Sequence, residues 1–408
     1  MIPRRWVRVS PADWKDIEDR LAACAAREVA IEEWEAAIAR FTGMPYAAAV
    51  SSGRQGMLGI LEYLGIGPAQ EVIVPAYTLG ELLPLIQRLG AGVAPADIDP
   101  GTFNVTADTI AARISSRTRA ILVLHAFGAP ANIPPILELA ASRHIPVIED
   151  CAHSLGATLS GRQTGSFGAA GFFSFETTKP VNTWGGGMVV TSDAALAEFV
   201  RAKHRAGTIS TDFLRAKLRG VRMEQRLFRT GIARVPLLVL ALPGLQTVIP
   251  RLYRRVQRAT PQSLRYLPLQ AEIGLEKLPA LEERIDARNR LAMAYREALR
   301  PEIRTQALLP EARSAWYFYV IKLPTPVRWP RLQLLLKGID AGIESEIADD
   351  CAALLGRQDC PHARELYAHA LALPMHDQLT LDQAGRVAET LNRLLTVAGG
   401  KRTRLPRR

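Results

Sequence analysis

The feature that most restricts the fold of this sequence is a regular alternation, from Glu71 onward, of short apolar runs with longer helical patterns. Helical spacing of apolar residues is found at 80–90 and at 134–144, between runs that are rich in Val, Ile and Ala. Strands that alternate with helices in this way form a mostly parallel sheet flanked by helices, so the sequence predicts the α/β class. The predicted strands are EVIVPA (71–76), AGVAPADID (91–99), AILVLHAFG (120–128), IPVIED (145–150), GFFSF (171–175) and GMVVTSD (187–193).

The pattern changes after Leu269, where helical spacing dominates. The elements expected there are a helix over 270–299, a strand over 315–322, a helix over 330–337 and a last helix from Thr380. This part is predicted to form a smaller C-terminal α+β domain. A chain of 408 residues favours two or three domains, at roughly 150 residues each. The predicted division is a large α/β domain over 1–205, an inserted segment over 206–268 and the small domain over 269–408.

The 206–268 segment carries much of the basic excess of the chain. The formal net charge is +11, and residues 201–258 hold fourteen Lys/Arg against two acids. An uncharged run at 235–250 is interrupted by three prolines and is shorter than the roughly 20 apolar residues of a bilayer-spanning helix, so it is not expected to cross a membrane. The basic amphipathic stretch between Phe213 and Phe228, followed by this apolar run, is typical of an element that lies on a membrane surface. An oligomer contact or a lid over the substrate fits the same pattern equally well.

Three observations restrict partners and compartment. The basic residues alternate with a long aliphatic run instead of with aromatic side chains that stack on bases, so nucleic-acid binding is not expected. The four cysteines (Cys24, Cys151, Cys351 and Cys360) are scattered without metal-binding spacing, which predicts no metal site, no disulfides and a reducing compartment. The basic N-terminus is not followed by the apolar stretch of a secretory signal. We therefore expect a cytoplasmic protein, with peripheral contact to the inner face of the membrane as the alternative.

Residues suited to one kind of chemistry converge at the ends of predicted strands, where ligands of open α/β sheets bind. The turn over 51–56 opens a helix, whose free N–H groups attract a phosphate. Asp150 ends one strand, and Lys179 follows another, ahead of the glycine run 185–187. Burial would weaken the hold of this lysine on its proton and make its amine a nucleophile. The set suits pyridoxal 5'-phosphate (PLP): the lysine bonds to its aldehyde, the aspartate keeps its ring nitrogen protonated, and the helix start holds its phosphate.

These motifs belong to a longer series that resembles the DegT/DnrJ/StrS family of PLP-dependent sugar aminotransferases. The resemblance runs from about Glu35 to Leu395, with additional residues between Arg205 and Gln262, and it implies a PLP-dependent transferase of fold type I. It is most specific between Ile148 and Thr191. The matching stretches are SSGRQGML, GIGPAQEVIVPAYTL, PADIDPGTFNV, SRTRAILVLHAFGAPANI, IPVIEDCAHSLGA, GSFGAAGFFSFETTKPVNTWGGGMVVT, LQAEIGLEKL and ALPMHDQLT, in this order.

The resemblance implies a role for each matched residue. Lys179 is the lysine that binds the cofactor covalently, and Asp150 is the partner of its pyridine nitrogen. His153 stands where the family has a Gln or His that bonds near the 3-oxygen of the cofactor, and Ser174 matches a serine that binds the phosphate. Arg265 stands on a segment that reaches a neighbouring active site in family dimers, so a homodimer is expected. The phosphate turn is assigned to Ser52, Gly53, Arg54 and Gln55.

Four positions depart from the family pattern. Arg54 replaces a threonine near the phosphate, and Leu79 replaces the aromatic residue that stacks on the pyridine ring. Gly185 replaces a glutamate ahead of the double glycine, and Ser263 replaces an asparagine that a neighbouring subunit offers to the phosphate. These departures leave the electron-sink chemistry intact and bear on which substrate is bound.

The resemblance implies an aminotransferase that moves an amino group from an amino acid, glutamate, to a keto sugar that is nucleotide-linked or lipid-linked. Two alternatives remain beside it. A sugar dehydratase of the same family carries histidine in place of the lysine, and Lys179 argues against it. A non-catalytic, PLP-binding regulatory protein is the other alternative, to which the departures at Leu79 and Gly185 point.

Overall fold

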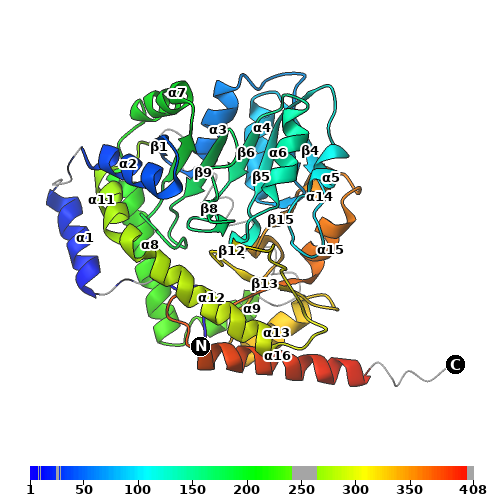
Figure 1. Cartoon of the computed structure of the whole chain (residues 1–408). Coiled ribbons are helices and arrows are strands. Elements are labelled where there is room, and N and C mark those ends of the chain that lie inside the picture. Colours follow the sequence, from blue (N-terminus) through cyan, green and yellow to red (C-terminus); the bar gives the residue numbers. More distant parts are fainter. Residues whose placement is uncertain (8, 10, 24–26, 28, 241–263, 402–408) are drawn as a thin grey trace.

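The computed structural model describes residues 1–7, 9, 11–23, 27, 29–240 and 264–401 (Figure 1). Its centre is a seven-stranded sheet in the order β1-β10-β9-β6-β5-β2-β4. The strands are β1 (Tyr46–Val50), β2 (Glu71–Pro75), β4 (Gly92–Ala96), β5 (Thr118–Leu124), β6 (Val147–Asp150), β9 (Ala170–Ser174) and β10 (Gly187–Thr191). The β10 strand pairs antiparallel with β1 and β9, and the other pairs are parallel. The predicted mostly parallel sheet is confirmed, and β1 is a strand that the sequence analysis did not predict.

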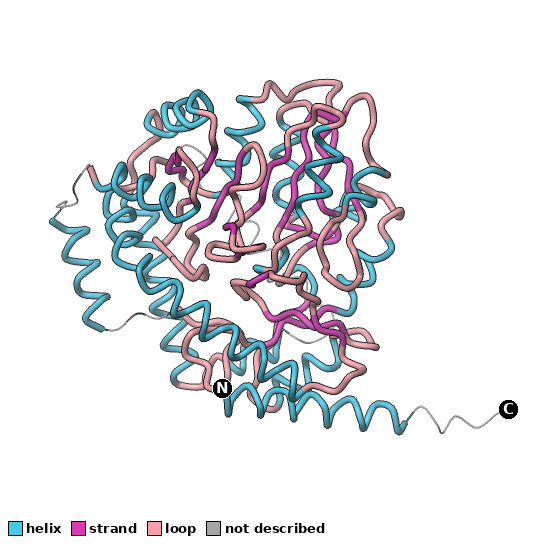
Figure 2. Tube along the Cα trace, in the orientation of Figure 1, coloured by secondary structure: helices cyan, strands magenta, loops and turns pink. Residues whose placement is uncertain are grey.

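Helices cover both faces of this sheet, as Figures 1 and 2 show. One face packs against α3 (Gly53–Tyr63), α4 (Leu83–Arg88) and α7 (Ala194–Arg205). The other packs against α2 (Ala30–Thr42), α5 (Ala107–Ala111), α6 (Ile133–Ala141) and α11 (Pro268–Lys277). Side chains along a strand point alternately to the two faces of the sheet. In β2, Val72 and Val74 pack on the first face and Ile73 packs on the second. Burial on both faces explains the nearly continuous apolar strands, since each fully buried aliphatic side chain contributes about 1.5–3 kcal/mol.

A second, smaller sheet follows in the C-terminal part, and the predicted α+β character is confirmed. Its order is β11-β13-β16-β14, all antiparallel. Its strands are β11 (Arg304–Thr305), β13 (Tyr319–Lys322), β14 (Gly342–Ile343) and β16 (Ala370–Leu373), and it packs with α12 (Leu281–Ala298), α13 (Arg328–Leu336) and α16 (Leu381–Lys401). The N-terminus joins this part, because Ile2 bridges to Ile339 and shares its apolar cluster (Figure 1). The division at 205/206 and 268/269 remains a prediction.

The remaining elements are short. They are β3 (Tyr77–Thr78), β7 (Thr158–Leu159), β8 (Arg162–Gln163), β12 (Ala312–Arg313), β15 (Asp349–Asp350), α14 (Cys351–Leu354), α15 (Pro361–His369) and the 3-10 turns η1 (Gly80–Leu82), η2 (Ala126–Gly128), η3 (Leu278–Ala280) and η4 (Glu344–Glu346).

Two predicted elements of the C-terminal part have different boundaries. The helix over 270–299 is divided into α11 and α12 by the turn η3, which contains Pro279, a residue that cannot donate a helical hydrogen bond. The strand over 315–322 is regular only from Tyr319. Before it, Trp316 has a φ of 43°, and the N–H of Tyr317 donates to the carbonyl of Phe127 at 2.8 Å. The chain is thereby drawn to the large sheet, and this contact places Tyr317 near the carboxyl ends of its strands.

The amphipathic stretch of the 206–268 segment forms the helix α8 (Thr211–Arg229), which is followed by α9 (Arg234–Leu240). The apolar side of α8 is inside the protein, where Leu214, Leu218 and Val221 share a cluster with Trp14 of α1 (Pro11–Ala23) and with Trp184. The expectation that these residues enter a membrane surface is wrong, because they are buried against the rest of the chain. Residues 241–250 of the predicted apolar run lie outside the described residues. Among the described helices, none is both long and apolar enough to cross a bilayer.

Candidate active site

The carboxyl ends of β5, β6 and β9 meet at one edge of the large sheet. Asp150, the last residue of β6, is in register with Leu124 of β5 and Phe172 of β9. Ser174 ends β9, and Lys179 lies in the turn that leads from β9 to β10. The structure therefore brings the predicted residues Asp150, Ser174 and Lys179 to the same edge.

The turn that opens α3 closes on this edge. Ser52 caps the helix, since its Oγ accepts the N–H of Gln55 at 3.3 Å, and its backbone bridges to Gly186 in the glycine run. A Cβ on Gly53 would lie 3.4 Å from the Cβ of Ser174, so the glycine lets the turn approach β9 closely. The free N–H groups at the helix start and the Ser174 hydroxyl thus lie together, which suits a phosphate.

Arg54, the departure within this turn, already has a carboxylate partner. Its guanidinium pairs with Glu81, which lies in the 3-10 turn directly after Leu79. Leu79 itself is 45% exposed in the single chain, so its side chain is available to a ligand. The departures at Arg54 and Leu79 therefore meet at one place, beside the phosphate turn.

Asp150 is a buried carboxylate, with 4% of its surface exposed. Its Oδ1 accepts the N–H of Ala152 at 3.0 Å. Burial raises the pKa of Asp150 to about 6, although this hydrogen bond and the charge of Lys179 act in the opposite direction. A carboxylate that is costly to ionise here is suited to a cationic partner, which would restore its charge.

Lys179 faces an aromatic residue that the sequence analysis did not single out. Its Nζ lies 3.8 Å from the ring centre of Tyr317, whose hydroxyl is 2.8 Å from the Thr178 hydroxyl. The ring of His153 also stacks on the ring of Tyr317, with 4.4 Å between the two ring centroids. A cation held over a ring gains about 0.5–2 kcal/mol, so Tyr317 fixes the position of the amine. The one available signal was the aromatic run 316–319, which is equally typical of a core strand.

The ionisation of these neighbours is set by burial and by Lys179. Burial, and then the charge of Lys179, lowers the pKa of His153 well below its usual range, so the ring is neutral. Burial alone would raise the pKa of Tyr317, but the charge of Lys179 and the bond to Thr178 lower it overall. A neutral histidine beside the lysine can donate or accept a hydrogen bond without adding a competing cation.

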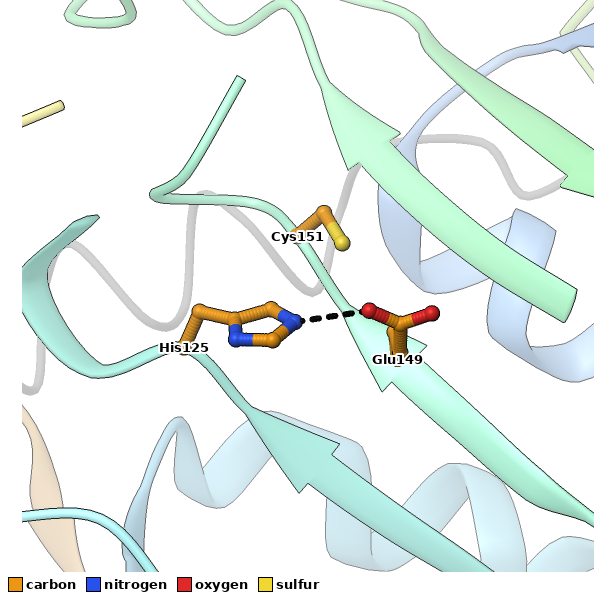
Figure 3. Close-up of side chains that lie close together, drawn as sticks. All are labelled: His125, Glu149 and Cys151. Carbon is orange, nitrogen blue, oxygen red and sulfur yellow. Dashed lines mark hydrogen bonds and ion pairs between the residues drawn. The ribbon is translucent and has the colours of Figure 1, made fainter. Parts of the chain in front are cut away.

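At the end of β6, the side chains of His125, Glu149 and Cys151 lie close together in an arrangement that resembles a metal site (Figure 3). The His125 Nδ1 accepts the N–H of Ala131 at 3.1 Å, so its Nε2 carries the proton and donates to Glu149 at 2.9 Å. The carboxylate also accepts three backbone N–H groups of the 165–168 turn at 2.7–2.8 Å. Because these hydrogen bonds occupy both ring nitrogens and both carboxylate oxygens, the group holds the turn together and offers no ready ligand to a metal.

This pair also supports the end of β6. Burial opposes ionisation of Glu149, but the bonds from His125 and from the backbone lower its pKa below its usual range. The backbone N–H of His125 donates to the carbonyl of Asp150 at 3.2 Å. His125 and Glu149 therefore support Asp150, one through this hydrogen bond and the other as its neighbour in β6. The sequence analysis did not identify either residue, and the only signal was a polar residue at the end of each of two apolar strands.

Two predictions concern a neighbouring subunit, and a single chain does not test them. The N–H of Arg265 donates to the carbonyl of Thr208 at 2.9 Å, and the adjacent Tyr266 packs on Gly186 in the glycine run. Ser263 lies outside the described residues. The role of Arg265 therefore stays a prediction.

The site fits a phosphorylated aromatic cofactor with a cationic ring nitrogen. Among the described side chains, the buried Ser51 Oγ and His153 Nδ1 have no hydrogen-bond partner within the chain. Such atoms are costly unless a ligand satisfies them. With the close approach at Gly53 and the buried Asp150, they form a set in which PLP would supply each missing partner: phosphate oxygens, a ring oxygen and a pyridinium.

Comparison with known proteins points the same way. A family model described as the DegT/DnrJ/EryC1/StrS aminotransferase family matches residues 25–392. The UDP-N-acetyl-3-dehydro-alpha-D-glucosamine 3-aminotransferase of Acidithiobacillus ferrooxidans is 30% identical over 371 residues, which cover 88% of this chain and 87% of that protein. The GDP-perosamine synthase of Caulobacter vibrioides is 30% identical over 376 residues, 90% of each chain. The solved aminotransferase TlmJ from Streptoalloteichus hindustanus shares the fold, with a TM-score of 0.78 at 23% identity over 98% of this chain and 100% of that one.

Proposed function

Because the chain belongs to the DegT/DnrJ/EryC1/StrS aminotransferase family, we propose that it transfers an amino group from glutamate to the keto group of a nucleotide-linked sugar. Membership of this family makes the chain a PLP-dependent aminotransferase. Glutamate as the amine donor and a nucleotide-linked sugar as the acceptor are what we propose. Two relatives at 30% identity are named for UDP- and GDP-linked sugars, which favours a nucleotide over a lipid carrier. The observation that carries the reaction type is the meeting of Asp150, Lys179 and the phosphate turn at one sheet edge.

PLP, when bound, supplies an electron sink for proton transfer at the carbon that bears the amine. Lys179 would hold the cofactor covalently and, as a free amine, would take up and return the proton as general base and acid. Tyr317, held by Thr178, keeps the Lys179 amine in place.

The remaining residues orient the cofactor. The Asp150 carboxylate pairs with the ring nitrogen and keeps it protonated. The neutral His153 would bond to the oxygen on the ring, and the N–H groups of the 52–55 turn with the Ser174 hydroxyl would hold the phosphate. Arg54, whose guanidinium pairs with Glu81, stands at this place, where the resemblance to the family implies a hydroxyl.

A screen of keto sugars tests the proposed substrates. With glutamate as donor, we expect amine transfer to a nucleotide-linked keto sugar, with one equivalent of 2-oxoglutarate per amine, and no transfer to a lipid-linked one. Amine transfer to the lipid-linked sugar alone would reverse the choice of carrier. A cofactor absorbance band that glutamate does not change would instead favour the non-catalytic, PLP-binding regulatory protein. A sugar that loses water without gaining an amine would favour the dehydratase.

We also propose that the protein is a cytoplasmic homodimer with a peripheral contact to an anionic membrane. The dimer is supported by the family segment at Arg265. The contact is supported by an exposed stripe along α8 (Arg215, Arg219, Arg222, Arg226 and Arg229) and by exposed apolar residues after it (Ile232, Val235 and Val239). Each such cation near an anionic leaflet contributes about 1 kcal/mol.

Sedimentation tests both of these assemblies. The protein alone is expected to sediment as a dimer, and a fully active monomer would contradict the first proposal. With vesicles that contain anionic lipid, the protein is expected to co-sediment at low salt, and binding should weaken as salt is raised. Replacing the five arginines of the stripe by glutamine should remove binding and leave the dimer intact. Equal binding to neutral and anionic vesicles, or binding to neither, would contradict the membrane contact.

A further inference from the structure

We propose that Lys217, on α8, is a positioning residue of the active site, because its ion pair with Glu176 holds the turn that presents Lys179. The proposal rests on the assignment of Lys179 as the cofactor-binding lysine. It also makes the 206–268 segment a supporting part of the site. Arg265, predicted to bind the cofactor, was the one site residue that the sequence analysis assigned to this segment.

Glu176 organises the turn from within. Its carbonyl accepts the N–H of Lys179 at 2.9 Å, and its carboxylate Oε1 accepts the N–H of Thr177 at 2.8 Å. The second oxygen, Oε2, accepts from the Lys217 ammonium at 2.6 Å. Glu176 and Lys217 are mostly covered, with 30% and 20% of their side chains exposed. Lys217 therefore holds Glu176 from outside the turn, and Glu176 in turn bonds to the backbone N–H groups of Thr177 and Lys179.

The helix that carries Lys217 is fixed to the other end of the same turn. Leu214 and Leu218 of α8 share an apolar cluster with Trp184, which is 1% exposed and has a φ of 63°. A Cβ on Gly185 would lie 3.0 Å from the Lys217 Nζ, and the φ of Gly185 is 127°. The glycine that departs from the family pattern thus makes room for this ammonium. A positive charge from α8 fills the space at the glycine run.

The charges around the two residues determine what loss of Lys217 does. The charge of Lys179 acts on the ionisation of Asp150, His153 and Tyr317, whereas Lys217, and more weakly Arg54, act on the ionisation of Glu176. Burial opposes ionisation of Glu176, but the charge of Lys217 and the hydrogen bond from it hold its pKa below the usual range. Without Lys217, the Glu176 carboxylate keeps only the weaker influence of Arg54, and we expect its negative charge in this turn to favour the protonated form of Lys179.

The test measures the reactivity of Lys179 in the protein without cofactor. Acetylation by a trace of acetic anhydride, followed across pH by mass spectrometry of the Lys179 peptide, reports how much amine is unprotonated. We expect Lys217→Met to slow acetylation of Lys179 at pH 8 by about 3–10-fold and to move the midpoint to higher pH. Lys217→Arg should restore the rate to within about twofold, since a cation again faces Glu176.

Two further variants separate charge from folding. Glu176→Gln combined with Lys217→Met should regain most of the rate, because the unpaired carboxylate is gone. Lys203→Met, which removes the ion pair between Lys203 of α7 and Glu62 of α3, should leave the rate unchanged. An unchanged midpoint in Lys217→Met, or a double variant as slow as the single one, overturns the proposal. Cofactor attachment to another lysine would overturn the assignment of Lys179 instead, and it would not alter the acetylation result.

Discussion

Replacing Lys179 by alanine is expected to abolish covalent attachment of PLP and to lower amine transfer by at least about 10³-fold. The variant loses both the nucleophile that binds the aldehyde and the group that moves the proton. Borohydride reduction of the cofactor-loaded wild-type protein should tag the peptide that contains Lys179, and the alanine variant should carry no tag. Non-covalent PLP binding is expected to persist, because the phosphate turn and Asp150 remain.

Lys179→Arg is the matched variant, since it keeps the positive charge over Tyr317 and cannot form the covalent bond. It should be as inactive as the alanine variant. The chemical competitor is Lys277, whose pKa burial lowers to about 8 and whose ammonium donates to the carbonyl and side chain of Asn182 at 2.8 and 2.9 Å. A borohydride tag on Lys277, or appreciable turnover by Lys179→Arg, would contradict the assignment.

Asp150→Asn is expected to lower the rate of the glutamate half-reaction by about 10²–10³-fold, the effect of losing a preorganised electrostatic partner. Asparagine matches the size of the aspartate but cannot stabilise a protonated ring nitrogen. Stopped-flow absorbance of the bound cofactor measures this half-reaction directly. A variant that retains a near-wild-type rate would remove Asp150 from the mechanism.

The same substitution is expected to stabilise the protein without cofactor. Asp150 has a pKa of about 6 in the folded chain against 3.8 in the unfolded one, so between these values the folded state binds more protons. The free energy of unfolding therefore falls as pH rises through this window, and above about pH 6 the buried carboxylate costs on the order of 2–3 kcal/mol. Denaturant unfolding at pH 8 should show Asp150→Asn to be more stable by about that amount. Near pH 4 the two proteins should be about equal; a variant that is less stable at pH 8 would contradict this account.

Most of the fold was predictable, because two-sided burial leaves apolar strands that the sequence displays directly. The C-terminal part was harder to predict. Its β14 (Gly342–Ile343) and β16 (Ala370–Leu373) belong to a sheet whose strands are only two to four residues long. Such strands carry too few residues for a periodic pattern. Pro279 was visible, but whether it divides a helix or begins one depends on the packing on both sides.

The site could be predicted where it is local in sequence. Asp150, His153, Ser174 and Lys179 stand on adjacent strands and their following turns, so their order alone indicates one site. Tyr317 could not be found in this way, because it reaches Thr178 over a separation of 139 residues and only the docking of the small sheet joins them. Lys217 looked like one cation among many, and the ion pair with Glu176 depends on how α8 packs.

The turn that carries Lys179 starts and ends on neighbouring strands, since Ser174 of β9 pairs with Gly187 of β10. Closing a loop between two such points costs little chain entropy beyond what the sheet has already removed. Within the loop, Glu176 bonds to the N–H groups of Thr177 and Lys179, and the Tyr317 ring lies under the Lys179 amine. The amine is therefore held in its reactive position before any cofactor arrives. Capture of PLP should then proceed at the speed of encounter and bond formation, without a slow step that orders this turn.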